Sequence, residues 1–209
     1  MDVRSAEKKM AFLREQVVWY NDDMEKQPEK TRDLSEIRIE SERLVLVPIS
    51  LNFDKDIFAE FDDEVTKYMP IGPNESIEAT DDFIRGAVEQ AEAGENLQLV
   101  VTDREGEFLG LTSVKHANTR EPELGLWLKK DAQGQGFGSE STFALVEWVQ
   151  DNLDFDYLRF RADSENSGSW KIAEKLIEKY SGEYVGEQIE ALRDGDRMTK
   201  FYKIFSKNP

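Results

Sequence analysis

Cysteine is absent from the 209-residue sequence, and histidine occurs only once. The missing cysteine excludes disulfide bonds, thiolate metal sites and a cysteine nucleophile. It is compatible with the reducing environment of the cytoplasm, where we expect the protein to be located. The single histidine, His116, falls in a predicted loop, where it is expected to be solvated rather than catalytic. No set of residues has the spacing of a metal site, so no metal is expected.

Long apolar runs and an excess of basic residues are also missing. No apolar run approaches the ~20 residues that a membrane-spanning helix needs. The charged start of the chain has no signal-peptide core. Lys and Arg total 27 against 44 Asp and Glu, which gives a formal net charge of -17. Because nucleic acids and anionic membranes both bind basic surfaces, neither is an expected partner. The acidic surface is either simply solvated or attracts cationic amines.

Residues 1–36 are interpreted as a helical extension that precedes the main domain, residues 37–209. A helix is predicted over 6–26, where apolar residues recur at steps of three and four: Met10, Leu13, Val17, Tyr20 and Met24. Gln27 and Pro28 end it. This apolar stripe either packs on the chain's own domain or forms a short coiled-coil seam. The protein is therefore expected to be a monomer or a homodimer joined through this helix.

The pattern of the main domain predicts a mixed α+β fold. Alternating apolar residues predict strands over 97–101, 108–114, 123–128, 157–162, 183–189 and 198–205, and a strand pair or one bent strand over 37–49. Helical spacing is weak over 57–65 and clear over 76–93, 139–151 and 170–180. Ser76 is expected to cap the helix over 76–93, with Phe83, Ile84, Ala87 and Ala91 on its buried face. The order predicts a mostly antiparallel sheet flanked by helices, with one right-handed crossover.

A glycine-rich turn joins the strand over 123–128 to the helix over 139–151. Its sequence is Gln133-Gly134-Gln135-Gly136-Phe137-Gly138. A turn that ends a strand and opens a helix points several backbone N–H groups in one direction. Together with the positive end of the helix dipole they form an anion site. Glycine lets the backbone approach a ligand closely and adopt positive φ. We therefore expect a phosphorylated ligand at this turn.

The spacing of the glycines excludes two kinds of nucleotide-binding loop. The nucleotide P-loop requires a lysine followed by serine or threonine directly after its last glycine, and no such lysine is present. The dinucleotide fingerprint requires Gly-x-Gly-x-x-Gly at the start of a repeated βαβ unit. Here the glycines stand at alternate positions, and the turn follows a predicted hairpin.

The turn instead resembles the Gln/Arg-x-x-Gly-x-Gly/Ala pattern of the GNAT N-acetyltransferases. The strand Glu123-Leu124-Gly125-Leu126-Trp127-Leu128 resembles the strand that precedes this pattern in the family. The segments 39–46 and 166–175 resemble the ribosomal-protein-alanine acetyltransferase-like branch, which is related to spermidine and aminoglycoside acetyltransferases. The resemblance covers about residues 37–205. The sequence departs from the pattern after Leu176, where a longer helix is expected, and at Ser169-Trp170, where many members have a tyrosine.

The resemblance implies that the co-substrate is acetyl-CoA, and that its acetyl group passes to a primary amine by direct attack in a ternary complex. The backbone of Leu126, Trp127 and Leu128 would bind the pantetheine arm and thioester. The residues expected to hold the pyrophosphate are Gln133, Gly134, Gln135, Gly136, Phe137, Gly138 and Ser139. Asn166 would contact the cofactor arm, or otherwise cap or turn the chain.

Two side chains are candidates for proton transfer. Glu123 is the expected base, directly or through water, with Glu121 as a neighbouring rival. Ser169 is the expected donor to the departing sulfur. The simpler interpretations are an exposed carboxylate at a strand end for Glu123 and a helix cap for Ser169. Four lysines are candidates to offset the cofactor's phosphates, although solvated surface positions are common for lysine: Lys129, Lys130, Lys171 and Lys175.

The acceptor is left open between a protein N-terminal amine and a small polyamine or aminoglycoside. By resemblance, the loop over 68–73 either shapes the acceptor pocket or is purely structural. The alternative function is a non-catalytic module that binds acyl-CoA as a sensor, or that uses the fold only for protein interactions.

Overall fold

The computed structural model describes residues 32–192 and 195–207. The helix predicted over 6–26, and the dimer hypothesis that depends on it, lie outside the described residues. The part described begins close to the core. The Leu34 side chain is buried, and its backbone N–H donates to the carbonyl of Ala91 at 2.9 Å.

The sheet is mixed and mostly antiparallel, so the structure is of the α+β class. Its strand order is β1-β2-β3-β4-β5-β6-β8-β7. The strands are β1 (Ile39–Glu40), β2 (Leu44–Pro48), β3 (Leu97–Asp103), β4 (Phe108–Lys115), β5 (Glu123–Leu128), β6 (Tyr157–Asp163), β7 (Glu183–Leu192) and β8 (Gly195–Phe205). The expected strand pair over 37–49 is therefore confirmed as β1 and β2, which pair antiparallel.

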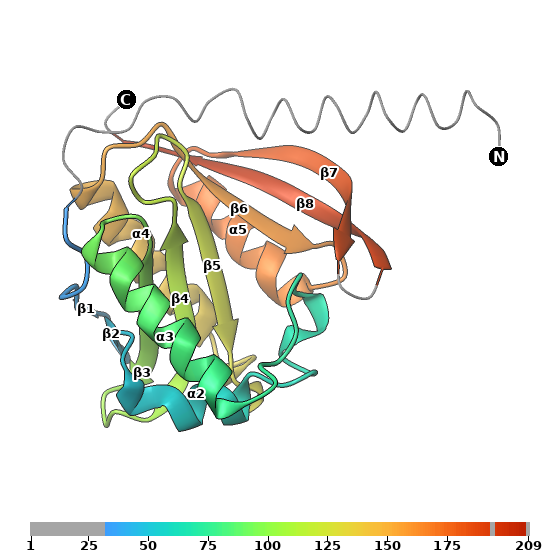
Figure 1. Ribbon diagram of the computed structural model, residues 1–209. Coiled ribbons are helices and arrows are strands. Elements are labelled where there is room, and N and C mark those ends of the chain that lie inside the picture. Colours follow the sequence, from blue (N-terminus) through green and yellow to red (C-terminus); the bar gives the residue numbers. More distant parts are fainter. Residues whose placement is uncertain (1–31, 193–194, 208–209) are drawn as a thin grey trace, which may run out of the picture. The chain divides into compact units, whose positions relative to one another are not determined.

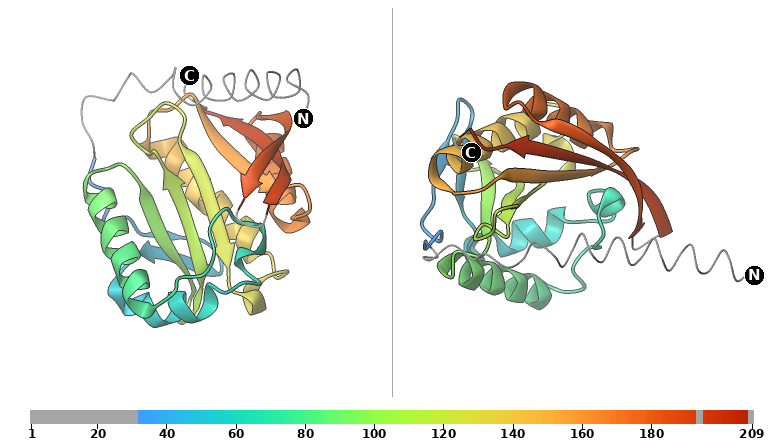
Figure 2. Two further views of the ribbon diagram at one scale, coloured as in Figure 1. Left: turned by 45° about the vertical axis from the view of Figure 1, so that its right-hand side comes forward. Right: turned by 90° about the horizontal axis from the view of Figure 1, so that it is seen from above.

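Helices cover both faces of this sheet (Figures 1 and 2). The α-helices are α2 (Asp54–Glu60), α3 (Ile77–Glu92), α4 (Phe137–Asn152) and α5 (Ser167–Lys179). Short 3-10 helices are η1 (Leu51–Phe53), η2 (Thr66–Tyr68) and η3 (Lys130–Ala132). α2 and α3 lie on one face, and α4 and α5 lie on the other.

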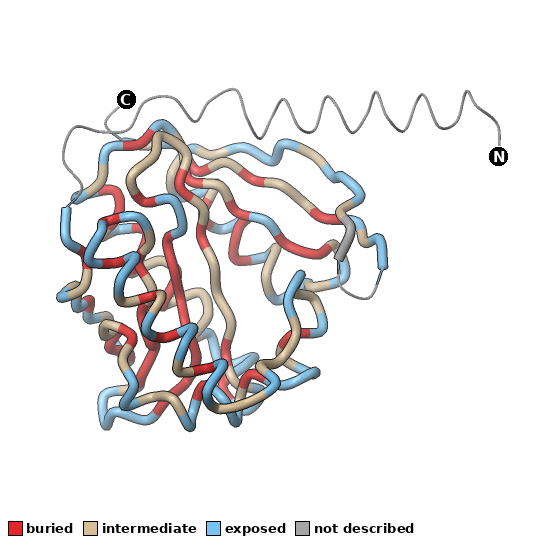
Figure 3. The backbone as a smooth tube through the Cα atoms, in the orientation of Figure 1, coloured by how far each residue is buried: buried red, intermediate tan, exposed pale blue. Residues whose placement is uncertain are grey.

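Each face has its own hydrophobic core, because successive side chains of a strand point to opposite sides. Val101 packs with α4 and α5 in the larger cluster, whereas its neighbour Val100 packs with α2 and α3 in the smaller one. The backbone tube in Figure 3 shows β3 and β4 buried along most of their length. The same alternation along β5 sends Leu124, Leu126 and Leu128 to the larger cluster and Trp127 to the smaller one.

α3 confirms the predicted cap and corrects the predicted buried face. The hydroxyl oxygen of Ser76 accepts a hydrogen bond from the backbone N–H of Ala79 at 3.2 Å. The buried residues of α3 are Thr80, Ile84, Ala87 and Ala91, whereas Phe83 is 41% exposed. One residue of helix turns through about 100°, so a side chain next to Ile84 is rotated away from the core.

β5 and β6 are neighbours over only a short length. They run parallel, connected by the crossover helix α4, and pair at Glu123↔Arg159 and Leu124↔Phe160. β5 pairs with β4 over all six of its residues, and β6 pairs with β8 over all seven of its own. Beyond Leu124 the two parallel strands therefore separate, as Figure 1 shows.

Candidate active site

The glycine-rich turn follows β5 and η3 and forms the N-terminal end of α4. Gly134 and Gly136 have φ of +74° and +86°, and Gly136 is the residue that caps the helix. The Gln133 side chain donates to the carbonyl of Leu128 at 3.0 Å, and that of Gln135 donates to the carbonyl of Asp131 at 2.6 Å. Both glutamines therefore bind back onto the chain that precedes them. A Cβ atom at Gly134 would meet nothing within 4 Å, so the backbone there is open.

Gly138 brings the start of α4 against β5 and α5. A Cβ at this position would lie 3.2 Å from Ile172 Cδ1 and 3.3 Å from Leu126 Cδ2. These contacts, rather than an unusual φ, explain why a residue without a side chain suits this position. Leu126 belongs to β5 and Ile172 to α5. The N-terminal end of α4 therefore lies beside the part of β5 that is not paired with β6.

The expected donor-binding residues Leu126, Trp127 and Leu128 lie on that same part of β5. One edge of their backbone pairs with β4 at Thr112, Leu111 and Gly110. On the other edge, within the described residues, β5 pairs with β6 only at Glu123 and Leu124. The Trp127 ring packs 4.9 Å from that of Phe61 and 5.8 Å from that of Phe108. The indole is thus part of the smaller core, while the free backbone edge faces the space between the strands.

Gly110 is a residue of this site that the sequence analysis did not single out. A Cβ there would lie 2.2 Å from the Trp127 carbonyl oxygen and 2.7 Å from Leu128 Cα. Such distances are not possible for a real side chain, so glycine is required for β4 to approach β5 this closely. The only signal in the sequence was a glycine inside a predicted strand, which often marks a close backbone approach.

Glu123 is the first residue of β5, pairs with Arg159 of β6, and is not an exposed strand-end carboxylate. Its side chain is 13% exposed and accepts a hydrogen bond from the Arg161 guanidinium at 2.9 Å. The same guanidinium donates to Glu190 at 3.0 Å. Burial alone would lower the pKa of Arg161, but the two carboxylates outweigh this and raise it above its ordinary value. The rival, Glu121, is half-buried, and its backbone N–H donates to Thr119 Oγ1 at 3.4 Å.

α5 begins at Ser167, three residues before the predicted start. The side chain of Asn166 accepts from the backbone N–H of Ser169 at 3.2 Å, so Asn166 is the N-cap. The capping role considered for Asn166 is therefore confirmed, and the one considered for Ser169 is wrong. Ser169 itself is half-buried in the first turn of the helix.

Two of the four lysines are paired with carboxylates of the protein. Lys129 donates to Glu107 at 2.6 Å, and this hydrogen bond raises the pKa of Lys129. Lys130 forms an ion pair with Glu64. Because these charges are already offset, neither lysine adds a free positive charge beside the turn. The Lys171 ammonium lies 5.5 Å from the centre of the Trp170 ring.

Charged groups of β6 and β8 contact a distant part of the chain. Arg197 of β8 lies 3.4 Å from Asp163 of β6 and over the Tyr68 ring of η2, 5.8 Å from its centre. Asp163 is a buried carboxylate with a side chain 2% exposed. The start of the loop over 68–73 is thus held near the C-terminal strands.

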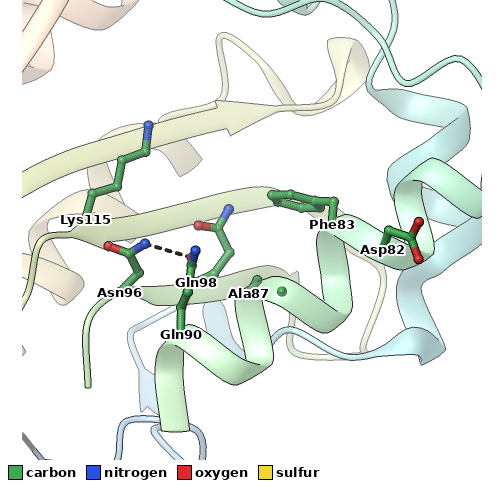
Figure 4. Close-up of a pocket in the computed structure, with 8 residues that line it drawn as sticks. Asp82, Phe83, Ala87, Gln90, Asn96, Gln98 and Lys115 are labelled. Carbon is green, nitrogen blue, oxygen red and sulfur yellow. Dashed lines mark hydrogen bonds between the residues drawn. The ribbon is translucent and has the colours of Figure 1, made fainter. Parts of the chain in front are cut away.

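A pocket of about 280 Å³ lies between α3 and the ends of β3 and β4 (Figure 4). Its lining residues are Asp82, Phe83, Gly86, Ala87, Gln90, Asn96, Gln98 and Lys115. Lys115 pairs in register with Glu123, which places the pocket beside the start of β5. His116 follows Lys115. His116 is exposed, as expected, but partial desolvation by the surrounding protein, together with the positive charge of Arg159, lowers its pKa below the ordinary value.

The described residues include no group of three histidine or acidic side chains that could hold a metal ion. In the same part of the chain, no helix is long and apolar enough to cross a membrane.

A strand that parts from its parallel neighbour, followed by a glycine turn at a helix start, is the arrangement of an acyltransferase of the GNAT class. A sequence model described as an acetyltransferase (GNAT) domain matches residues 43–176. The chain therefore belongs to the GNAT acetyltransferase family. It is 27% identical over 142 residues to the uncharacterized N-acetyltransferase p20 of Bacillus licheniformis, covering 65% of this chain and 79% of that protein.

Solved structures show the same fold. A GNAT acetyltransferase from Bacillus anthracis has a TM-score of 0.67 and 17% identity, covering 82% of this chain and 100% of the other. Spermidine N-acetyltransferase from Vibrio cholerae, in complex with CoA and spermine, has a TM-score of 0.69 and 16% identity, covering 79% and 97%. RimL, a ribosomal L7/L12 alpha-N-protein acetyltransferase, has a TM-score of 0.66 and 17% identity, covering 81% and 94%.

Proposed function

We propose that the protein transfers the acetyl group of acetyl-CoA to a primary amine by direct attack in a ternary complex. The observation that carries this proposal is the free edge of β5, beyond Leu124, beside the glycine turn that opens α4. An acyl donor with a diphosphate at one end and an extended amide chain at the other matches these two features in order.

The donor would bind through backbone groups. The N–H groups of Gly134 to Ser139 face the diphosphate, favoured by the positive end of the α4 dipole. Apart from the Leu128 carbonyl, which already accepts from Gln133, the free edge at Leu126 to Leu128 offers hydrogen bonds to the amides of the pantetheine arm. Asn166 caps α5, and Ile172 of α5 lies against the start of α4 at Gly138. The cap therefore helps to hold α5 beside the glycine turn. This binding needs no cation from Lys129 or Lys130.

The reaction requires the acceptor to be a neutral amine. Glu123 takes a proton from the protonated amine, directly or through a water molecule, and so makes it neutral. The amine nitrogen then bonds to the thioester carbonyl carbon, the carbon–sulfur bond breaks, and the nitrogen releases its second proton to solvent to give the amide. Ser169 donates a proton to the departing sulfur and regains one from solvent. Five strand steps, about 17 Å, separate Glu123 from Leu128. The donor must therefore extend along β5 for its reactive end to approach the carboxylate.

The acceptor class is a protein N-terminal amine or a small polyamine or aminoglycoside. It would enter from the face that carries Glu123, Tyr68 and Arg197, because Leu126 and Leu128 fill the opposite face. Spermidine N-acetyltransferase and RimL, which share the fold, represent the two classes.

The test is release of free thiol from acetyl-CoA with a panel of polyamines, aminoglycosides and peptides. Binding is measured first, since donor at ~100 times its dissociation constant adds ~2.7 kcal/mol to the unfolding free energy. Thiol release with one amine class supports the enzyme and identifies the class. Binding without release for any amine would favour the acyl-CoA sensor, and no binding would refute both.

We also propose that the predicted helix over 6–26, in the expected extension of residues 1–36, either packs on the main domain or joins two copies. The molecular mass in solution of the full chain and of a chain lacking residues 1–30, which keeps the buried Leu34, distinguishes the two. A halved mass after deletion supports the dimer, and a monomer in both cases supports packing on the chain itself.

A further inference from the structure

The turn between β1 and β2 reaches the glycine turn through one arginine. The Arg43 guanidinium donates to the carbonyl of Gln135 at 3.2 Å and lies 4.5 Å from the centre of the Phe137 ring. A Cβ at Gly136 would meet Arg43 Nη2 at 3.3 Å. Arg43 therefore packs along three consecutive residues of the turn, although it lies more than 90 residues away in the sequence.

The same arginine holds a carboxylate in the first turn of α4. Arg43 Nε donates to one oxygen of Glu140 at 2.7 Å, and its backbone N–H donates to the other at 2.7 Å. The Ser41 hydroxyl donates to that second oxygen, also at 2.7 Å. Burial alone would raise the pKa of Glu140, but these three hydrogen bonds outweigh it and lower the pKa below its ordinary value. Glu140 is therefore ionised wherever the protein is folded near neutral pH.

An ionised Glu140 poses an electrostatic problem for a diphosphate. A carboxylate in the first turn stabilises the helix itself. It also places a negative charge within one helical turn of the N–H groups that a diphosphate would occupy. A positive charge at the same place removes this repulsion, and Arg43 supplies it. Its hydrogen bond to Gln135 also occupies a carbonyl oxygen that could otherwise turn toward the ligand.

We propose that Arg43 is a positioning residue for donor binding: it neutralises Glu140 and holds the Gln135 carbonyl so that the N–H groups of the turn stay directed at the diphosphate. This inference rests on the proposed function. It adds a side chain from the start of the domain to a site otherwise built from backbone of residues 126–139.

The turn that presents Arg43 is itself held in place. Arg104, in the turn between β3 and β4, donates to the carbonyls of Ser41 and Glu42 and to the Glu40 carboxylate. Arg43 is thus supplied by an anchored turn, which lowers the cost of keeping its long side chain in one place.

The experiment compares two acetyl donors, acetyl-CoA and S-acetylpantetheine, which lacks the diphosphate. We expect Arg43→Gln to raise KM for acetyl-CoA about tenfold, the size of one lost charge-assisted hydrogen bond. KM for S-acetylpantetheine should stay within about twofold, and kcat should change little. A residue that only stabilises the fold would shift both donors alike.

A second variant isolates the charge. Adding Glu140→Gln to Arg43→Gln should recover most of the lost acetyl-CoA affinity, because the repulsive carboxylate is gone. Arg120→Gln is the matched control: Arg120 also binds two carboxylates, Asp154 and Asp156, and should leave both KM values unchanged. Thermal unfolding of each variant confirms that it is folded.

Direct binding of CoA and of inorganic diphosphate separates the possible failures. If the wild-type protein binds CoA and Arg43→Gln binds it equally well, the positioning role is wrong and the proposed function stands. If Arg43→Gln raises KM equally for acetyl-CoA and for S-acetylpantetheine, the positioning role is also wrong. If the wild type binds neither CoA nor diphosphate, the proposed function and the positioning role both fail.

Discussion

The two sides of β5 are built in different ways. On the side that we propose for the donor, the free strand edge, the glycine turn and the start of α4 come from one continuous stretch, residues 125–142. On the side that we propose for the acceptor, the contacts join distant parts of the chain, such as Tyr68 with Arg197 and Arg161 with Glu123 and Glu190. Backbone geometry dominates the first side, to which Arg43 and Glu140 add one side-chain pair, and side-chain pairs define the second. Substitutions should therefore separate them.

The largest effect is expected where β4 approaches β5 on the donor side. Gly110→Ala would force the Trp127 carbonyl and Leu128 away, and should cost about 3 kcal/mol of unfolding free energy. It should also abolish acetyl-CoA binding, because the free edge of β5 moves. Denaturant unfolding measures the loss of stability, and calorimetry measures the loss of acetyl-CoA binding.

Gly86→Ala in α3 is the control: its Cβ would meet nothing within 4 Å, and we expect stabilisation of about 0.5–1 kcal/mol. Normal binding by Gly110→Ala would contradict the donor-side geometry.

Glu123→Gln tests the acceptor side. If Glu123 is the base, kcat should fall about 100-fold, with KM for acetyl-CoA unchanged. Steady-state kinetics with the preferred amine measure this. Glu190→Gln removes the other carboxylate bound to Arg161 and serves as the matched control. An equal fall in both variants would mean that Glu123 acts only by holding the arginine.

The start of α5 offers a smaller, paired test. Asn166→Ala removes the cap and should cost about 1 kcal/mol of unfolding free energy. Ser169→Ala should change stability by less than about 0.5 kcal/mol, because Ser169 is not the cap. If Ser169 donates to the departing sulfur, kcat should nevertheless fall at least tenfold. Loss of stability without loss of turnover in Ser169→Ala would refute its catalytic role.

The smallest effect concerns the pKa of His116, which responds to the charge of the neighbouring Glu123. Partial desolvation and Arg159 lower this pKa, whereas Glu123 raises it. The NMR signal of the single histidine should titrate with a midpoint below 6.5. Because the folded state resists protonation, stability should fall slightly as the pH drops from 6.5 through that midpoint. Glu123→Gln should lower the midpoint further, and Glu140→Gln on the donor side should leave it unchanged. A changed His116 midpoint in Glu140→Gln would contradict the conclusion that the two sides of β5 are independent.

The donor side was predictable because glycine spacing and strand alternation are local signals. The strand over 123–128 and the turn after it followed directly from their residues. Capping was a possible role for both Asn166 and Ser169, and the helix start, three residues before the predicted one, makes Asn166 the cap. Phe83 was placed in the core because any apolar residue near the helical stripe fits the pattern, and only the packing shows which face is covered.

Contacts between distant segments could not be predicted. Nothing near Arg43 indicates that it meets Glu140, and nothing near Lys129 indicates that it meets Glu107. Both depend on strand order and register. The acceptor side consists largely of such contacts, which explains why the sequence indicates the donor more clearly than the acceptor.

The short pairing of β5 with β6 has a consequence for how the chain folds. The strands β2 to β5 are joined by antiparallel pairing of successive neighbours, and so are β7 and β8. In the part of the chain that the structure describes, β5 and β6 pair at two positions, and the Glu123–Arg161 ion pair and the packing of α4 and α5 also join them. Contacts that close a long loop form slowly, because the entropy of closure must be overcome first. We therefore expect the strands up to β5 and the strands β6 to β8 to form two sheets early, and the contact between β5 and β6 to form last. The ability to bind the donor would then appear only in the final step of folding.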